Sequence, residues 1–181
     1  MTTMTNLCEL TGDYVLDMAH TRIGFVARHT AATRVRGQFD EFDGSVHLDG
    51  DDPSKSSAKL TIRAASIQTG NQQRDKYLRS KFLNTDNHPT IIFTSTKVER
   101  VDATHFKVTG DLTMRGETKP VTVDFELTGT ENDPSADFRV GFAGRGTINR
   151  KDWGVRWNAA LGMVSKKVAL ALDVAAIRRL T

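Results

Sequence analysis

Alternation of apolar and polar residues runs through most of the chain. In the stretch 121–127, valine, phenylalanine and leucine occupy the odd positions, while threonine, aspartate and glutamate occupy the even ones. This period of two is typical of a β-strand with one buried and one solvated face. Because parallel strands tend to be apolar on both faces, the alternation favours antiparallel pairing. The pattern predicts strands at 13–17, 22–29, 33–48, 58–64, 91–101, 105–114, 119–129, 137–148 and 163–177.

The segment 33–48 changes the parity of its apolar positions. Apolar residues stand at odd positions up to Phe39 and at even positions from Phe42 onward. A change of parity inside one strand requires an extra residue, so we predict a β-bulge near Asp40–Gly44.

The segment 66–83 lacks the β-alternation and is rich in good helix formers. Asn71 can cap a helix at its N-terminus, and Asp75 can pair with Arg79 one turn later. We therefore predict a short helix at about 72–80, inserted between two strands.

Turn signals separate the predicted strands. The cluster at 49–56 is one of them, and Arg115-Gly116 fits the tip of a hairpin. About nine short strands with turns between them predict an all-β antiparallel barrel or sandwich. No linker or internal repeat interrupts the pattern, so we expect a flexible tail at 1–11 and one domain at 12–181.

The positions predicted to face inward mix large side chains with very small ones, such as Gly37, Gly110 and Gly144. An eight-stranded barrel is either filled by its own side chains or holds one small ligand. Small inward residues either leave room for such a guest or serve the taper and corners of the barrel. If the space is real, its lining is almost wholly apolar, and the guest would be an apolar chain rather than a sugar or nucleotide.

Composition narrows the classes of partner. The chain has 181 residues and a net charge of +3, and its basic residues are interleaved with acidic ones. This spread argues against a nucleic-acid partner. No run approaches the roughly 18 apolar residues of a membrane span, and the N-terminus has no secretory signal pattern, so we expect a cytoplasmic location. With one cysteine, Cys8, no intrachain disulfide can form.

The histidines and serines carry no pattern of a catalytic or metal centre. His20 and His29 are nine positions apart across a predicted strand, so they point to opposite faces, and only His29 shares the face of Ile23 and Phe25. Common metal-ligand spacings, a nucleophile elbow and a phosphate loop are absent from the sequence. We therefore expect no metal ligands and no catalytic residues.

The last predicted strand is apolar on both faces. Between 168 and 177, valine and leucine occupy one face, and alanine and isoleucine much of the other. An apolar outer face needs a cover, which the inserted helix or a second subunit would supply. We expect a homodimer.

Several stretches in order resemble the YceI-like family. They are YVLDMAHTRIGFVARH, VRGQFDEFDGSVHLD, AASIQTGNQQRDKYLRSKFLNTDNHPTIIFTST, GDLTMRGETKPVTVDFEL and GRGTINRKDWGVRWNAAL, and together they cover about residues 12–177. The resemblance implies a lipocalin-like, eight-stranded antiparallel barrel that holds a long apolar ligand. Polyisoprenoids, their quinone or phosphate forms, and fatty-acid-type amides are the ligands it implies, with no catalytic activity and commonly a dimer.

The resemblance also transfers to individual positions. His20 and His29 fall on the family's two N-terminal histidines, and Trp153 stands in the INRKDWG segment where phenylalanine is commoner. The helix matches the family pattern at Asn71, Arg74, Asp75, Leu78, Arg79 and Ser80. The chain departs from the family at KFLNTDNHP, where an acidic, phenylalanine-rich segment with a tyrosine is usual.

Our leading hypothesis is a non-enzymatic carrier or sequestering protein for a long apolar lipid, with no cofactor other than that ligand. Its polar head would lie near His29, Arg74 or Trp153. Its tail would contact Ile23, Phe25, Leu60, Ile62, Phe93, Val123, Phe125, Val140, Phe142 and Leu170. One alternative is a metal-dependent enzyme that modifies lipid. Another is an interaction module that uses its outer face and has a lumen filled by side chains.

Overall fold

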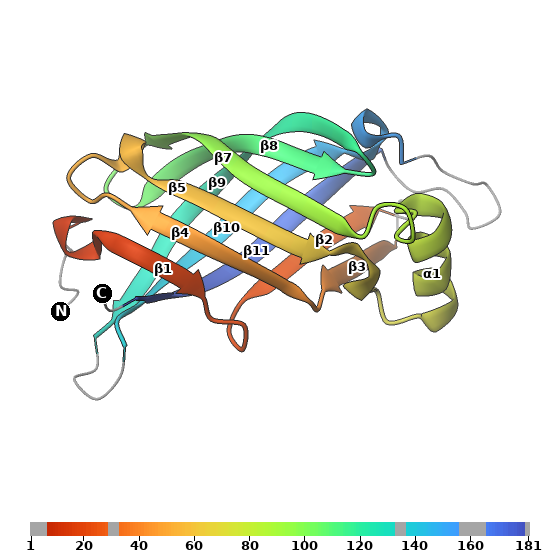
Figure 1. Ribbon diagram of the computed structural model, residues 1–181, viewed down its shortest axis with the longest axis horizontal. Coiled ribbons are helices and arrows are strands. Elements are labelled where there is room, and N and C mark those ends of the chain that lie inside the picture. Colours follow the sequence, from red (N-terminus) through yellow and green to blue (C-terminus); the bar gives the residue numbers. More distant parts are fainter. Residues whose placement is uncertain (1–6, 29–32, 133–136, 156–165, 180–181) are drawn as a thin grey trace.

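The computed structural model describes residues 7–28, 33–132, 137–155 and 166–179. Eight strands form a closed antiparallel barrel in the order β1, β4, β5, β7, β8, β9, β10, β11, with β11 returning to β1 (Figure 1). This confirms the predicted fold class. The strands are β1 (Gly12–Leu16), β2 (Arg22–Arg28), β3 (Arg34–Phe39), β4 (Phe42–Leu48), β5 (Ser57–Arg63), β6 (Ile67–Gln68), β7 (Thr90–Arg100), β8 (His105–Met114), β9 (Glu117–Glu131), β10 (Arg139–Asn149) and β11 (Lys167–Arg178).

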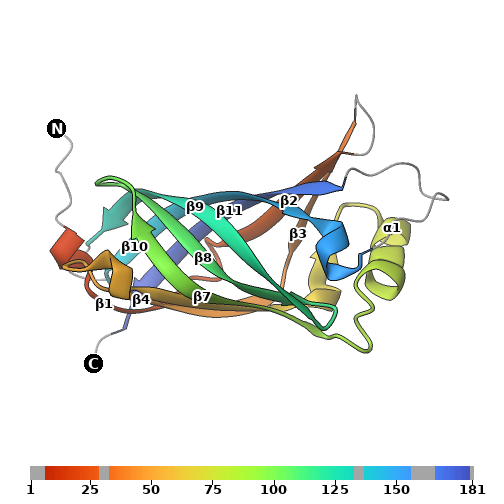
Figure 2. The same cartoon turned by 90° about the horizontal axis from the view of Figure 1, so that it is seen from above.

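Short helical elements lie at the two ends of the barrel. The helix α1 (Gln72–Tyr77) stands at one end, and the turn η1 (Leu7–Leu10) at the opposite end, as two perpendicular views show (Figures 1 and 2). The remaining short turns are η2 (Pro53–Lys55), η3 (Ala64–Ser66), η4 (Leu78–Phe82) and η5 (Arg150–Trp153).

The last strand closes the barrel against two separate strands. Its C-terminal part pairs with β1, and its N-terminal part, from Val168 to Asp173, pairs with β2. The corner between β1 and β2 is fixed to β11, since the Asp17 N–H and the Thr21 hydroxyl both donate to the carbonyl of Ala175, at 2.7 and 3.0 Å. The first two predicted strands, β1 and β2, therefore pair with two successive parts of the same strand, β11.

The parity change near residue 40 is a break between two strands instead of the predicted bulge. After the break, β4 pairs with β1 and β5, whereas β3 pairs with β2 and β6. The Asp40 N–H donates to the Ser66 carbonyl at 3.1 Å, and the Glu41 carbonyl accepts from the Arg63 N–H at 2.9 Å. These bonds pair the backbone groups at the break, and β4 then begins with its apolar residues at even positions.

The inserted helix is present, and Asn71 caps it as predicted. The Asn71 side chain accepts from the Arg74 N–H at 2.9 Å. The helix continues into η4, a wider turn in which the Leu83 N–H donates to the Leu78 carbonyl at 2.8 Å. The predicted residues 72–80 therefore span α1 and the start of η4.

The predicted ion pair between Asp75 and Arg79 is wrong. Asp75 is buried, and its carboxylate accepts from the Thr69 N–H at 2.9 Å and from the Thr69 hydroxyl. Arg79 instead donates from Nε to the Ala65 carbonyl at 2.9 Å. Both side chains therefore bind the helix to the segment that precedes it. A buried carboxylate needs hydrogen-bond donors, and Thr69 supplies them.

The turn at Arg115-Gly116 is the tip of the β8–β9 hairpin, as predicted. Met114 pairs with Glu117, which leaves two residues in the turn. Both have a positive φ, 53° and 74°. This is the conformation of a type I′ turn, whose twist matches that of the flanking strands.

Three of the small inward residues make room for aromatic rings. A Cβ atom built on Gly37, Gly110 or Gly144 would lie 2.2 to 2.5 Å from a ring atom of Phe25, Phe93 or Phe125, respectively. The space above these glycines is therefore occupied by phenylalanine side chains of the lumen. At these positions the small residues accommodate phenylalanine rings, which is neither of the two interpretations drawn from the sequence.

Replacing Gly144 by alanine is expected to destabilise the fold by about 1–3 kcal/mol, because the added methyl group displaces the Phe125 ring. The measurement is urea denaturation followed by circular dichroism. Gly129→Ala is the matched control, since nothing lies within 4 Å of a Cβ atom at Gly129. Its free energy of unfolding should change by less than about 1 kcal/mol. Equal losses in both variants would contradict the ring-packing role.

Candidate functional site

The lumen of the barrel contains a cavity of about 250 Å³. Along β8 its lining extends from Phe106 to Met114, about 27 Å of strand. With a strand tilt of about 40°, this corresponds to roughly 20 Å along the barrel axis. The apolar residues of the wall are Leu16, Ile23, Phe25, Phe39, Val46, Leu48, Ala58, Leu60, Ile62, Ile91, Phe93, Val98, Phe106, Val108, Leu112, Met114, Val121, Val123, Phe125, Phe142, Ile148, Leu170, Leu172 and Val174.

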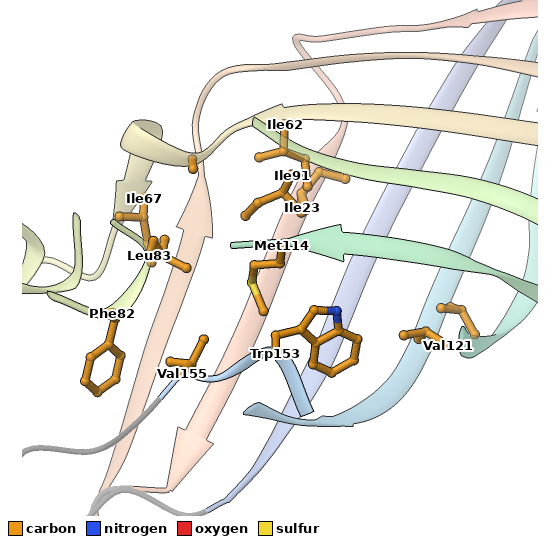
Figure 3. Packing of buried hydrophobic residues seen from close by; sticks show 12 residues of the cluster. Ile23, Ile62, Ile67, Phe82, Leu83, Ile91, Met114, Val121, Trp153 and Val155 are labelled. Atoms are coloured by element: carbon orange, nitrogen blue, oxygen red, sulfur yellow. The ribbon is translucent and has the colours of Figure 1, made fainter. Parts of the chain in front are cut away.

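At the α1 end, buried side chains pack into an apolar cluster (Figure 3). Trp153 is only 2% exposed, and its Nε1 donates to the Leu112 carbonyl at 2.9 Å. Ile67, Phe82 and Val155 complete this side of the cluster. Trp153 is therefore packed in this cluster and is not part of the cavity wall, and its contact with a head group stays a prediction.

Arg74 also lies away from the cavity. Its Nε donates to the Thr69 hydroxyl and its Nη2 to the Thr69 carbonyl, both at 2.8 Å. The sequence pattern offered Arg74 as a cation for a polar head group. In the structure its guanidinium is hydrogen-bonded to Thr69, in the segment that precedes α1. The sequence pattern did not indicate this contact.

The opposite end of the cavity, its mouth, is bordered by Leu7 and Leu10 of η1 and by Asp49, Gly50, Pro53 and Ser56 of the β4–β5 connection. This connection lies at the same end of the barrel as η1 (Figure 1). Ser57 and Lys59, at the start of β5, also border the cavity, but both are exposed and alternate with the inward Ala58 and Leu60. The polar residues that border the cavity thus lie near one end.

Hydrogen bonds hold η1 against the mouth. The Gly50 N–H donates to the Thr11 hydroxyl at 2.9 Å, and the Cys8 thiol donates to Asp51 Oδ1 at 2.8 Å. The buried Tyr14 hydroxyl donates to the Leu10 carbonyl at 2.8 Å. Residues 7–10 of the predicted tail therefore form a turn that lies on the barrel.

Nine of the thirteen residues predicted to contact a ligand line the cavity. They are Ile23, Phe25, Leu60, Ile62, Phe93, Val123, Phe125, Phe142 and Leu170. Val140 does not line it, because it is 1% exposed and packs in a second buried cluster with Tyr14 and Leu10. His29 lies outside the described residues. Contact with a lipid stays a prediction for all of these residues.

His20 belongs to the corner between β1 and β2 and does not line the cavity. Its Nδ1 lies 2.8 Å from Asp17 Oδ2, and Arg139 Nη1 donates to the same oxygen at 2.8 Å. Burial acts to raise the pKa of Asp17, but the hydrogen bonds from His20 and the Ala19 N–H, with the charge of Arg139, outweigh it and lower that pKa. The cluster stabilises a corner of the fold. Among the described residues, no group of three potential metal ligands is found.

The lining residues missing from the sequence prediction are of two kinds. Strand residues such as Val108, Leu112 and Leu172 have the same inward parity as the predicted ones, so the alternation contained their signal. The residues of the mouth come from a turn cluster and from η1, and no period marks them.

A closed antiparallel barrel with a hollow apolar interior defines a lipocalin-like barrel, a class whose lumen has room for one small ligand. In the described part of the chain, no helix is long and apolar enough to cross a membrane. The chain belongs to the YceI-like family, because residues 14–176 match the YceI-like domain.

Relatives and solved structures support this membership. A UPF0312 protein of Pseudomonas paraeruginosa is 39% identical over 173 residues, which cover 94% of this chain and 89% of the relative. The Campylobacter jejuni YceI protein superposes with a TM-score of 0.74 at 28% identity, covering 99% of this chain and all of the other. A polyisoprenoid-binding domain from Saccharophagus degradans shares the fold, with a TM-score of 0.69, 14% identity, and 93% and 99% of the two chains covered.

Proposed function

We propose that this protein binds one long apolar lipid, an isoprenoid or acyl chain, in its barrel lumen and carries or sequesters it without a catalytic step. The single observation that carries the proposal is the elongated apolar cavity. Its length of roughly 20 Å exceeds the ~15 Å depth of one leaflet of a bilayer core, so an extended hydrocarbon chain fits along it.

Burial of the chain supplies the affinity. Each buried methylene group contributes about 0.8 kcal/mol, without any directional contact. The wall consists of leucine, isoleucine, valine and phenylalanine from almost every strand of the barrel. Such a wall favours length and apolarity over a particular shape, which fits the polyisoprenoid-binding activity described for the Saccharophagus degradans domain.

The cavity also bears on the alternative of an interaction module. That alternative predicts a lumen packed full by side chains, whereas the lumen here has a free volume of about 250 Å³. An outer surface remains for partner contacts: Ala169 and Ala171 of β11 are exposed. The homodimer and the cytoplasmic location stay predictions.

The test is the extraction of natively purified protein with organic solvent and mass spectrometry of the extract, beside native mass spectrometry of the intact protein. We expect an added mass of one lipid per chain and an isoprenoid or acyl species in the extract. Delipidated protein should then take up the same species again. Failure to take up any long-chain lipid would overturn the proposal.

A further inference from the structure

Four neighbouring strands, β10, β11, β2 and β3, carry a strong excess of positive charge, although basic and acidic residues are interleaved over the chain as a whole. Together these strands contain eight arginine and lysine residues and one acidic residue, Asp173. Arg139 is paired with Asp17. Arg178 donates to the Glu9 carbonyl. The other six cations are exposed and are called the cationic face: Arg22, Arg28, Arg34, Arg36, Arg145 and Lys167.

The cationic face lies on the outer wall of the barrel. Its members alternate along the strands with residues that face the lumen, such as Phe25 and Leu170. Small residues lie between them. Ala171 of β11 is exposed and has Gly24 of β2 on one side and Arg145 of β10 on the other. The long cationic side chains therefore surround a low centre and are accessible to a partner.

The fold does not use most of these charges. Arg28 of β2 lies directly opposite Arg34 of β3, and like charges in this position destabilise a pair of strands. Within the described part of the chain, four guanidinium groups make neither a hydrogen bond nor an ion pair, those of Arg22, Arg34, Arg36 and Arg145. An anionic partner would turn this unfavourable arrangement into a favourable one.

Two carboxylates border the cationic face on one side. Asp173 is opposite Arg22, and Asp124 of β9 is opposite Arg145. On the paired strands β2 and β3, by contrast, no carboxylate lies opposite residues 28, 34 or 36. The positive charge is therefore densest where β2 ends and β3 begins, toward the α1 end of the barrel (Figures 1 and 2).

We propose that the cationic face docks the protein on a bilayer surface rich in anionic phospholipids. Guanidinium groups bind phosphate oxygens through two parallel, charge-assisted hydrogen bonds. Cations close to an anionic membrane surface each add to the binding. The docking uses the outer wall, so it goes beyond the proposed function and does not depend on what the lumen holds.

A bilayer fits this face better than a protein does. A symmetric dimer sets the same surface of both copies against each other, so a second copy on this face would oppose cations with cations. An acidic protein would need a concave surface to follow the convex wall of a barrel. The phosphate groups of a fluid bilayer rearrange around separated arginines.

The test is co-sedimentation of the natively purified protein with vesicles of phosphatidylcholine, alone or with 30 mol% phosphatidylglycerol, in 0.1 M NaCl. We expect at least tenfold tighter binding to the anionic vesicles, and its loss in 0.5 M NaCl, because salt screens exposed charges. Arg34→Gln/Arg36→Gln should weaken this binding at least tenfold, since each cation at such a surface is worth about fivefold.

The matched control is Lys55→Gln/Lys59→Gln. It removes the same charge from exposed residues of η2 and β5, away from the cationic face, and should change binding less than twofold. Circular dichroism checks that both double variants keep the fold.

The remaining outcomes would overturn the proposal. No binding to anionic vesicles, or equal binding to both kinds of vesicle, would exclude electrostatic docking on a membrane. Equal losses in the two double variants would show that net charge acts and the cationic face does not. Tighter binding to polyglutamate or duplex DNA than to the vesicles would assign the face to an acidic protein or a nucleic acid. Each of these results leaves lipid binding in the lumen untouched.

Discussion

Replacing Leu170 by arginine is expected to weaken lipid binding at least a hundredfold, about 2.8 kcal/mol. Leu170 lines the cavity on β11 and pairs with Phe25 of β2 and Gly146 of β10. A guanidinium at this position either occupies the lumen or pulls water into it, and both outcomes displace an apolar chain. Native mass spectrometry of delipidated protein with added geranylgeraniol measures the loss.

The neighbouring residue provides the control. Ala171 follows Leu170 on the same strand and is exposed on the outer surface of the barrel. Ala171→Arg adds the same charge outside the lumen, so it should bind lipid as the unchanged protein does. Because a charge in the lumen also strains the fold, Leu170→Trp serves as an uncharged variant that narrows the cavity. Binding retained in both Leu170 variants would contradict a site in the lumen.

Replacing Trp153 by alanine is expected to lower the free energy of unfolding by about 3–5 kcal/mol. Its ring is nearly fully buried in the cluster at the α1 end (Figure 3), and its removal leaves a large void and removes the hydrogen bond to the Leu112 carbonyl. Urea denaturation followed by circular dichroism measures the loss.

Trp153→Phe separates packing from hydrogen bonding. Phenylalanine keeps most of the apolar contact and loses the bond from Nε1 to Leu112, which contributes about 1 kcal/mol. We therefore expect a smaller loss, about 1–2 kcal/mol. Equal losses in both variants would show that the hydrogen bond, rather than the packing of the ring, carries the effect.

The strands and the lumen could be predicted because both follow from a local period. One strand places every second residue on the inner face, so residues such as Phe125 and Leu170 are assigned to the lumen without knowledge of their neighbours. The same rule also selected Val140, which is buried in one cluster with Tyr14 and Leu10 and does not line the cavity. The parity of a residue predicts which face of the strand its side chain lies on, but not which other side chains cover it.

The polar contacts could not be predicted in the same way, because they depend on segments that meet only after folding. Arg74 was predicted to lie near a head group because the helix matches the family pattern, and in the structure its guanidinium is bound to Thr69. Asp49 belongs to a turn cluster without a period, and its place at the mouth depends on the packing of η1 against Gly50. Such contacts are set by tertiary structure, which a single sequence does not display.

The pairing of β11 with both β1 and β2 has a consequence for the order in which the molecule assembles. Until β11 joins them, β10, β1 and β2 each have an edge that lacks its partner. Such edges favour pairing with other chains, and contacts between distant segments form slowly. Closure of this seam creates the enclosed lumen, so the proposed lipid ligand can be enclosed only once β11, the last strand of the chain, has paired.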